Sequence, residues 1–251
     1  MKTNDLYQSY ILSNAKLSVV MPAYNEGAHI YDNLKKTSRI LETFANTYEI
    51  IAVNDGSKDN TELEIKRAAE DDSHIRLISY SPNRGKGSAI RQGFLEANGD
   101  LIAFLDSDLE LSPELLQGFL YELVHQDADI VIGSKMHKDS KLNYPLSRKI
   151  MSWGYYMLLR LLFHLHTKDT QTGIKLFKRE TVIPIMQNLQ TCGYAFDIEI
   201  LATAKKNGKK IIEMPVEVKY TRNDVPGGMR IRIQDILRMF TDTIAIKKHL
   251  K

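Results

Sequence analysis

Short apolar segments rich in Val and Ile alternate with longer helical patterns along the first half of this chain. Five of these segments predict β-strands: LSVVMPAY (17–24), YEIIAVND (48–55), IRLISY (75–80), DLIAFLD (100–106) and ADIVIGS (128–134). Patterns with helical spacing separate them, at 28–44, 60–70, 88–97 and 113–125. Continuous apolar strands are typical of parallel sheets covered on both faces, so we predict an α/β fold with a doubly wound, mainly parallel sheet.

The pattern changes after Ser134. A polar, basic segment precedes an apolar stretch, and further elements follow: a strand GIKLFK (173–178), a helix at 196–206, a strand IIEMPVEVKY (211–220) and a final helix at 233–250. A chain of 251 residues can bury one large core. We therefore interpret residues 1–251 as a single domain, with the second half as a C-terminal elaboration of the first.

Composition excludes several classes of protein. The net charge of +3 is too small to argue for a nucleic-acid partner, and we expect none. Cys192 is the only cysteine, which indicates a reducing compartment, and we expect it to be a small buried residue. The N-terminal residues contain no continuous apolar region of a signal peptide, and no apolar run is long enough for a transmembrane helix. We expect a cytoplasmic protein, soluble or attached to a membrane surface.

Polar motifs follow four of the predicted strands, at the edge where open α/β sheets bind ligands. They are PAYNE (22–26), NDGS (54–57), NRGKG (83–87) and DSD (106–108). Taken singly, NDGS can be a turn with a helix cap and RGKG a flexible turn. Lys86 at the positive start of a helix is unfavourable unless it meets an anion, which favours a phosphate nearby.

The segment DSDLE suggests a metal site. Asp106 and Asp108 leave the strand on the same side, and their repulsion would force one to take up a proton unless a cation binds. Carboxylate oxygens suit Mg²⁺ or Mn²⁺, which commonly bind substrate phosphates as further ligands. Glu110 is a candidate third ligand, and the alternative is a group of solvated loop acids.

Taken together, these motifs resemble those of the GT-A family-2 glycosyltransferases over residues 17–134. The second half is similar to the polyprenyl-phosphate hexose synthases, the dolichyl-phosphate glucose and mannose synthases and their bacterial relatives. The motifs that carry this likeness are GSK (133–135), LSRKIMS (146–152), DTQTGIKLFKRE (169–180), GYAFDIEIL (193–201) and EMPVEV (213–218). The resemblance implies a Rossmann-like GT-A fold, with 17–134 binding the nucleotide sugar and 135–251 facing the acceptor and the membrane.

The resemblance also implies roles for individual residues. The nucleotide-sugar site would include Pro22, Tyr24, Glu26, Asp55, Lys86, Ser107, Arg222 and Arg230. The metal site would include Asp106, Asp108 and Glu110. The catalytic residues would be Asp106, Asp108, Lys135, Arg148 and Asp197. Lys135 stands where the family often has Arg, so it would meet phosphate as a point charge. Met229-Arg230 replaces a common Ser-Lys in the loop expected to close over the donor.

The implied reaction is metal-dependent transfer of a hexose, with inversion, from UDP-glucose or GDP-mannose to a polyprenyl phosphate. The motif DTQTG is more similar to the glucose synthases than to the mannose synthases, and this resemblance favours UDP-glucose. A phosphate monoester has a second pKa of ~6, so it can attack without a protein base. An alternative is a sugar acceptor in cell-surface polysaccharide synthesis, with Asp197 or Glu199 as general base unless these acids only organise the site. A third alternative is a non-catalytic nucleotide-sugar-binding protein.

The apolar stretch 155–165 has two interpretations. It is either a buried helix or an amphipathic helix in the membrane interface, assisted by the basic final helix. The second interpretation predicts a peripheral protein on the cytoplasmic face of the membrane. We expect no C-terminal membrane anchor of the kind that some members carry, which leaves room for a separate membrane-embedded partner.

Overall fold

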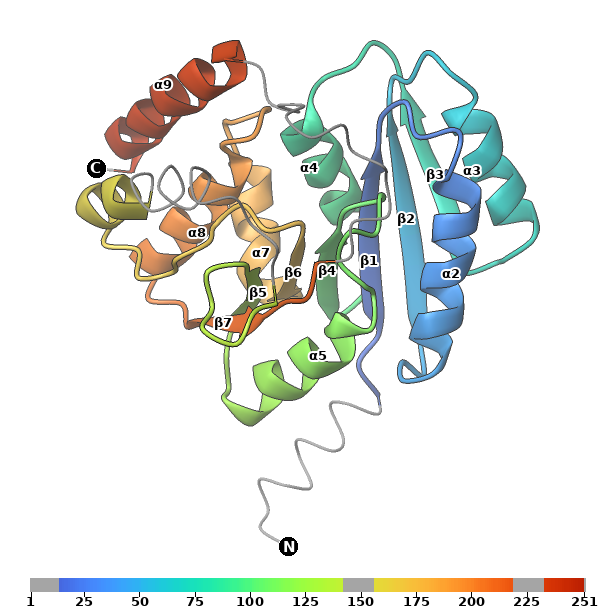
Figure 1. Cartoon of the computed structure of the whole chain (residues 1–251), viewed down its shortest axis with the longest axis horizontal. Helices are drawn as coiled ribbons and strands as arrows, with labels where there is room; N and C mark the ends of the chain where they lie inside the picture. Colours follow the sequence, from blue (N-terminus) through green and yellow to red (C-terminus); the bar gives the residue numbers. More distant parts are fainter. Residues whose placement is uncertain (1–13, 142–155, 219–232, 251) are drawn as a thin grey trace, which may run out of the picture.

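The computed structural model describes residues 14–141, 156–218 and 233–250, which form a seven-stranded sheet between helical layers (Figure 1). The strands are β1 (Leu17–Ala23), β2 (Tyr48–Asp55), β3 (Ile75–Tyr80), β4 (Leu101–Leu105), β5 (Ile130–Ser134), β6 (Ile174–Lys178) and β7 (Ile211–Pro215). Their order is β3-β2-β1-β4-β6-β5-β7. Paired neighbours are parallel except at β6, which is antiparallel to β4 and β5, so the predicted mainly parallel sheet is confirmed.

Helices cover both faces of the sheet, as continuous apolar strands require. The helices are α2 (Ile30–Glu42), α3 (Thr61–Glu70), α4 (Lys86–Glu96), α5 (Leu115–His125), α7 (Arg179–Gln187), α8 (Phe196–Lys206) and α9 (Ile233–His249). The buried residues of α2, α3 and α5 join one core, and those of α4, α7 and α8 join the other. Every residue of β1, β2 and β4 is buried, whereas the edge strand β3 is partly exposed.

Three features differ from the prediction. Helix α7 was not expected, because Pro184 lies inside it and proline usually ends a helical pattern. The strand predicted to reach residue 220 ends at Pro215, after which the described residues form isolated bridges at Glu217 and Val218. Cys192 is exposed, not buried.

The apolar stretch at 155–165 contains a helix at 156–163 in its described part. Leu159 and Phe163 are buried in the second core, so the interpretation as a packed helix holds for this face. Met157 and Leu161 are exposed on the same helix. No helix within the described ranges is long and apolar enough to cross a bilayer.

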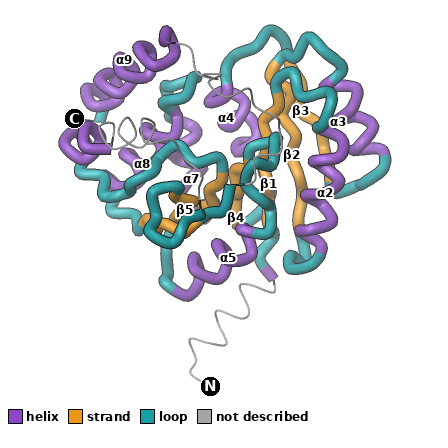
Figure 2. Tube along the Cα trace, viewed as in Figure 1, coloured by secondary structure: helices purple, strands orange, loops and turns teal. Residues whose placement is uncertain are grey.

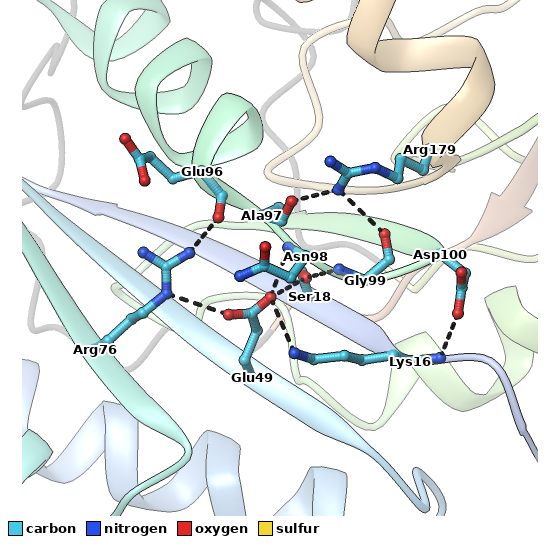
Figure 3. A network of polar contacts seen from close by, with 10 residues as sticks. All are labelled: Lys16, Ser18, Glu49, Arg76, Glu96, Ala97, Asn98, Gly99, Asp100 and Arg179. Atoms are coloured by element: carbon cyan, nitrogen blue, oxygen red, sulfur yellow. Dashed lines mark hydrogen bonds and ion pairs between the residues drawn. The ribbon is translucent and has the colours of Figure 1, made fainter.

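A polar network joins the amino ends of the strands, at the edge opposite the predicted site (Figure 3). Glu49 of β2 accepts hydrogen bonds from Ser18 Oγ (2.7 Å), Asn98 N (2.8 Å) and Arg76 Nε (3.2 Å). Burial opposes the ionisation of Glu49, but these bonds and the charge of Lys16 outweigh it, so its pKa lies below the ordinary value. The ionised carboxylate therefore stabilises the folded chain.

We predict that Glu49→Gln lowers the free energy of unfolding at pH 7 by about 1–3 kcal/mol, because it removes a charged acceptor. The folded-state pKa is depressed, so this contribution is present above the unfolded pKa of about 4.3 and is lost as the pH falls through the folded value. Urea unfolding at pH 7 and near pH 3 measures both effects. Glu70→Gln, at an exposed position of α3, is the control and should change little. Equal stability of Glu49→Gln and the unmodified chain at pH 7 would contradict the assignment.

Candidate active site

The loop after β1 is fixed by the turn after β2. Asn25 N donates to Ser57 Oγ (3.0 Å), and Lys58 N donates to Asn25 Oδ1 (2.9 Å). Asp59 Oδ2 accepts from Gly27 N (3.0 Å). The NDGS motif thus acts as a turn that supports the PAYNE loop. The loops of these parallel strands lie at one end of the sheet (Figure 2).

The residues predicted to line the nucleoside pocket differ in exposure. Tyr24 is 43% exposed at the end of β1, Glu26 is half-buried, and Pro22 is buried within the strand. Ser107 is buried, and its carbonyl accepts a hydrogen bond from Asn33 Nδ2 (2.8 Å). Of these predicted residues, Tyr24 is the most exposed, whereas Pro22 and Ser107 are buried, and their contact with a nucleoside stays a prediction.

Asp55 organises the loop after β3. Its carboxylate accepts hydrogen bonds from Arg84 N (2.8 Å), Gly85 N (3.0 Å) and Asn83 Nδ2 (2.8 Å). Asp55 is 3% exposed, so these contacts replace water around a buried charge. The predicted hydrogen bond from Asp55 to a base stays a prediction, while the structure gives this residue a role in holding the NRGKG loop.

The first amides of α4 bind a carbonyl of the loop before α8. Gly87 N and Ser88 N lie 2.9 Å and 3.3 Å from the carbonyl oxygen of Cys192. Gly85 has φ +94°, and a Cβ at this position would lie 2.7 Å from the same oxygen. The glycine is required for this close approach. The first amides of α4 are thus capped by this carbonyl, and the phosphate predicted near Lys86 stays a prediction.

Lys86 meets an anion, as its position at a helix start requires, but the anion is Asp106. Lys86 Nζ lies 2.6 Å from Asp106 Oδ1, and each side chain is 31% exposed. Asp106 N donates to Gly173 O (2.8 Å), which ties the end of β4 to the start of β6. A Cβ on Gly173 would lie 2.2 Å from Asp106 Oδ2. Gly173 therefore leaves the space that this carboxylate fills.

Asp108 lies beside Asp106 and carries the electrostatic signature expected of a carboxylate pair. Burial raises the pKa of Asp108, and the charges of Asp106 and Glu110 raise it further. Asp108 Oδ1 accepts a hydrogen bond from Glu110 N (3.2 Å). In the part of the chain that the structure describes, no three His, Cys, Asp or Glu side chains are grouped to hold a metal ion. The described arrangement thus does not assemble Glu110 with the two aspartates.

A second ion pair lies beneath the first. Lys175 Nζ of β6 lies 2.6 Å from Asp197 Oδ1 of α8 and also donates to Thr172 O (2.6 Å). Burial raises the pKa of Asp197 to about 6, although Lys175 acts in the opposite direction. Both ammonium groups flank the ring of Phe104, with Nζ 5.1 Å (Lys86) and 5.4 Å (Lys175) from its centroid. Sequence reasoning missed Lys175, although a lysine inside the apolar strand GIKLFK was a signal for it.

Glu199 organises the loop that reaches α4. Its carboxylate accepts hydrogen bonds from Gln190 N (2.9 Å), Thr191 N (2.8 Å) and Thr191 Oγ1 (2.7 Å). The sequence allows two interpretations of Glu199, as a general base or as an acid that only organises the site. These hydrogen bonds fit the second interpretation. The loop then presents the Cys192 carbonyl to the start of α4.

Lys135 follows β5 at the same edge of the sheet. Its backbone N donates to Asp169 Oδ2 (2.9 Å), so the first residue of the DTQTG motif holds the backbone of this lysine in place. Arg148, Arg222 and Arg230 lie outside the described residues. The structure therefore places Asp55, Lys86, Asp106, Asp108 and Lys135 along one edge of the sheet.

Comparison with known proteins assigns the family. Residues 18–184 match the Glycosyl transferase family 2 domain. The chain is a family 2 glycosyltransferase. A dolichyl-phosphate beta-glucosyltransferase of Trichomonas vaginalis is 34% identical over 245 residues, which cover 93% of this chain and 71% of the relative. The Homo sapiens protein of that name is 31% identical over 247 residues, covering 92% of this chain and 75% of the relative. The predicted likeness to polyprenyl-phosphate glucose synthases is confirmed.

Solved structures support the fold of this glycosyltransferase. A glucosyl-3-phosphoglycerate synthase of Mycobacterium tuberculosis, in complex with Mn²⁺, UDP and phosphoglyceric acid, has a TM-score of 0.71. It is 21% identical and covers 100% of this chain and 83% of that chain. The predicted GT-A fold is confirmed, and at this identity the likeness extends to the fold alone.

The residues at the end of β4 fit a divalent cation. Asp106 and Asp108 supply hard oxygen donors, and their mutual repulsion is the kind that a cation relieves. The ammonium of Lys86 already provides one positive charge at Asp106. Two carboxylates suit an ion that takes its remaining ligands from water and phosphate, as Mg²⁺ does and as Mn²⁺ can.

We predict that Gly173→Ala lowers glycosyl transfer on the order of 100-fold, because the added Cβ displaces the Asp106 carboxylate. Thermal unfolding should show that the variant still folds. Gly118→Ala in α5 is the matched control, since its Cβ would meet only Met214 Cε at 3.8 Å, and it should retain activity. Full activity of Gly173→Ala would contradict the positioning role of this glycine.

Proposed function

We propose that this glycosyltransferase transfers glucose from UDP-glucose to a polyprenyl phosphate, with inversion, giving a β-linked polyprenyl-phosphate glucose. Relatives named dolichyl-phosphate beta-glucosyltransferases support the acceptor and the sugar. Solved neighbours that hold UDP or UDP-glucose with Mn²⁺ support the donor class and a divalent metal. GDP-mannose is the donor that this proposal has to be tested against.

A phosphate acceptor is supported over a sugar acceptor by the surroundings of the two acids that are candidates for a general base. Asp197 is 5% exposed and paired with Lys175, and the carboxylate of Glu199 accepts three hydrogen bonds from its own loop. A sugar hydroxyl needs a base within hydrogen-bond reach, and neither acid suits that role. A phosphate monoester, with a second pKa near ~6, is largely dianionic at neutral pH and needs cations instead.

The charged residues along the sheet edge supply those cations and hold the donor. Asp106 and Asp108 would hold Mg²⁺ or Mn²⁺, which would stabilise negative charge on the leaving diphosphate. Lys86 lies beside this position and would contact the diphosphate. Lys135 and Arg148 would orient the acceptor phosphate. Tyr24, Glu26 and Asp55 would hold the nucleoside, and Arg222 and Arg230 would close over the donor.

A lipid acceptor also requires contact with a membrane surface. Leu161 is 77% exposed on the helix at 156–163, and Ile244 is 54% exposed on α9. Lys247 Nζ donates to Leu162 O, which joins these two helices. Lys247 and Lys248 add positive charge in the last turn of α9. We propose that this surface binds the cytoplasmic face of the membrane, where a separate membrane-embedded protein could receive the product.

The test measures radiolabel transfer from UDP-glucose and from GDP-mannose to a polyprenyl phosphate in vesicles, with Mg²⁺ or Mn²⁺. We expect label from UDP-glucose in a mild-acid-labile lipid and a β-anomeric proton by NMR. Asp108→Ala should lower transfer at least on the order of 100-fold. Asp127→Ala, at an exposed carboxylate, should retain it.

Three results would contradict parts of this proposal. An α-linked product would overturn inversion, and full turnover by Asp108→Ala would overturn the metal site. Label in a sugar polymer, or donor binding without transfer to lipid, would favour the sugar-acceptor or the non-catalytic alternative.

A further inference from the structure

The ammonium of Lys86 contacts one oxygen of the carboxylate that is expected to bind the metal. Lys86 Nζ lies 2.6 Å from Asp106 Oδ1. The other oxygen, Asp106 Oδ2, lies so close to Gly173 that a Cβ on this residue would be 2.2 Å from it. Oδ1 is therefore the oxygen that can turn toward a ligand, and Lys86 is bound to it.

Lys86 places an ammonium group directly against this carboxylate. A divalent ion that approaches Asp106 thus meets a positive charge held 2.6 Å from the same oxygen. The two cations repel each other, so one of them has to leave.

Lys86 needs another anion when it leaves Asp106. Asp197 is already paired with Lys175 at 2.6 Å, and both of these side chains are buried. The start of α4 cannot serve as that anion, because its own partial charge is positive. A nucleoside diphosphate supplies the missing anion, since it brings negative charge together with phosphate oxygens that are ligands for the metal.

We propose that Lys86 is an internal counter-ion of the metal site, released from Asp106 only when metal and nucleoside diphosphate are both bound. The inference rests on the metal and the donor of the proposed function. It follows that the metal alone binds weakly and that each ligand strengthens the binding of the other. Because coupling free energies are reciprocal, UDP raises the affinity for Mn²⁺ by the same factor by which Mn²⁺ raises the affinity for UDP.

The experiment measures Mn²⁺ affinity by electron paramagnetic resonance, with and without UDP, in the full chain. UDP should tighten Mn²⁺ binding to the unmodified protein by about 5- to 150-fold. Lys86→Met should bind Mn²⁺ without UDP about tenfold more tightly than the unmodified protein, because no ammonium competes at Asp106. The same variant should show a smaller effect of UDP.

Three further variants make the result specific. Lys66→Met removes an exposed lysine that pairs with Glu62 on α3, and its Mn²⁺ affinity should equal that of the unmodified chain. Adding Asp106→Asn to Lys86→Met should abolish the gain, which assigns the bound ion to Asp106. Lys86→Gln repeats the test with a polar side chain, and thermal unfolding establishes that each variant is folded.

Equal or weaker Mn²⁺ binding by Lys86→Met and Lys86→Gln without UDP, while Mn²⁺ and UDP bind the unmodified protein together, would overturn the counter-ion role and leave the proposed function standing. Absence of Mn²⁺ binding in every variant, with or without UDP, would instead overturn the metal site of the proposed function and this inference with it.

Discussion

Strand β6 runs antiparallel between β4 and β5, and the charged site depends on this placement. In the register of β4 and β6, Lys175 lies opposite Phe104. Asp106 follows Phe104 by two residues, so the side chains of Lys175 and Asp106 leave the sheet on the same face. Asp106 then pairs with Lys86 and Asp197 with Lys175, and both ammonium groups lie over the Phe104 ring. In a poorly solvated setting, each charge is tolerated because an opposite one lies beside it.

The two halves of the chain are joined at this site. The first half supplies Lys86 and Asp106, and the second supplies Gly173, Lys175 and Asp197. The loop before α8 adds a backbone contact, since the Cys192 carbonyl caps α4 and Glu199 holds that loop in place. At the opposite edge of the sheet, the bonds of Glu49 secure the strand starts (Figure 3). Polar groups thus stabilise one edge of the sheet and form the candidate active site at the other.

Much of this arrangement followed from the sequence because it is locally encoded. Continuous apolar runs predicted the strands, and parallel strands bring their carboxyl ends to one edge, so Asp55, Lys86 and Asp106 were expected together. What could not be predicted depends on contacts between distant segments. Helix α7 contains Pro184, which local rules treat as a helix end. The partners of Lys86, Lys175 and the Cys192 carbonyl come from other elements, and no spacing rule connects them.

A crystal structure of the protein with Mn²⁺ and UDP is the most direct test of Lys86 as counter-ion of the metal site. We expect anomalous density for Mn²⁺ at Asp106 and Asp108, with Lys86 Nζ moved from Asp106 to the diphosphate and the Lys175–Asp197 pair intact. Mn²⁺ bound away from Asp106, or Mn²⁺ at Asp106 with Lys86 still 2.6 Å from Oδ1, would contradict it.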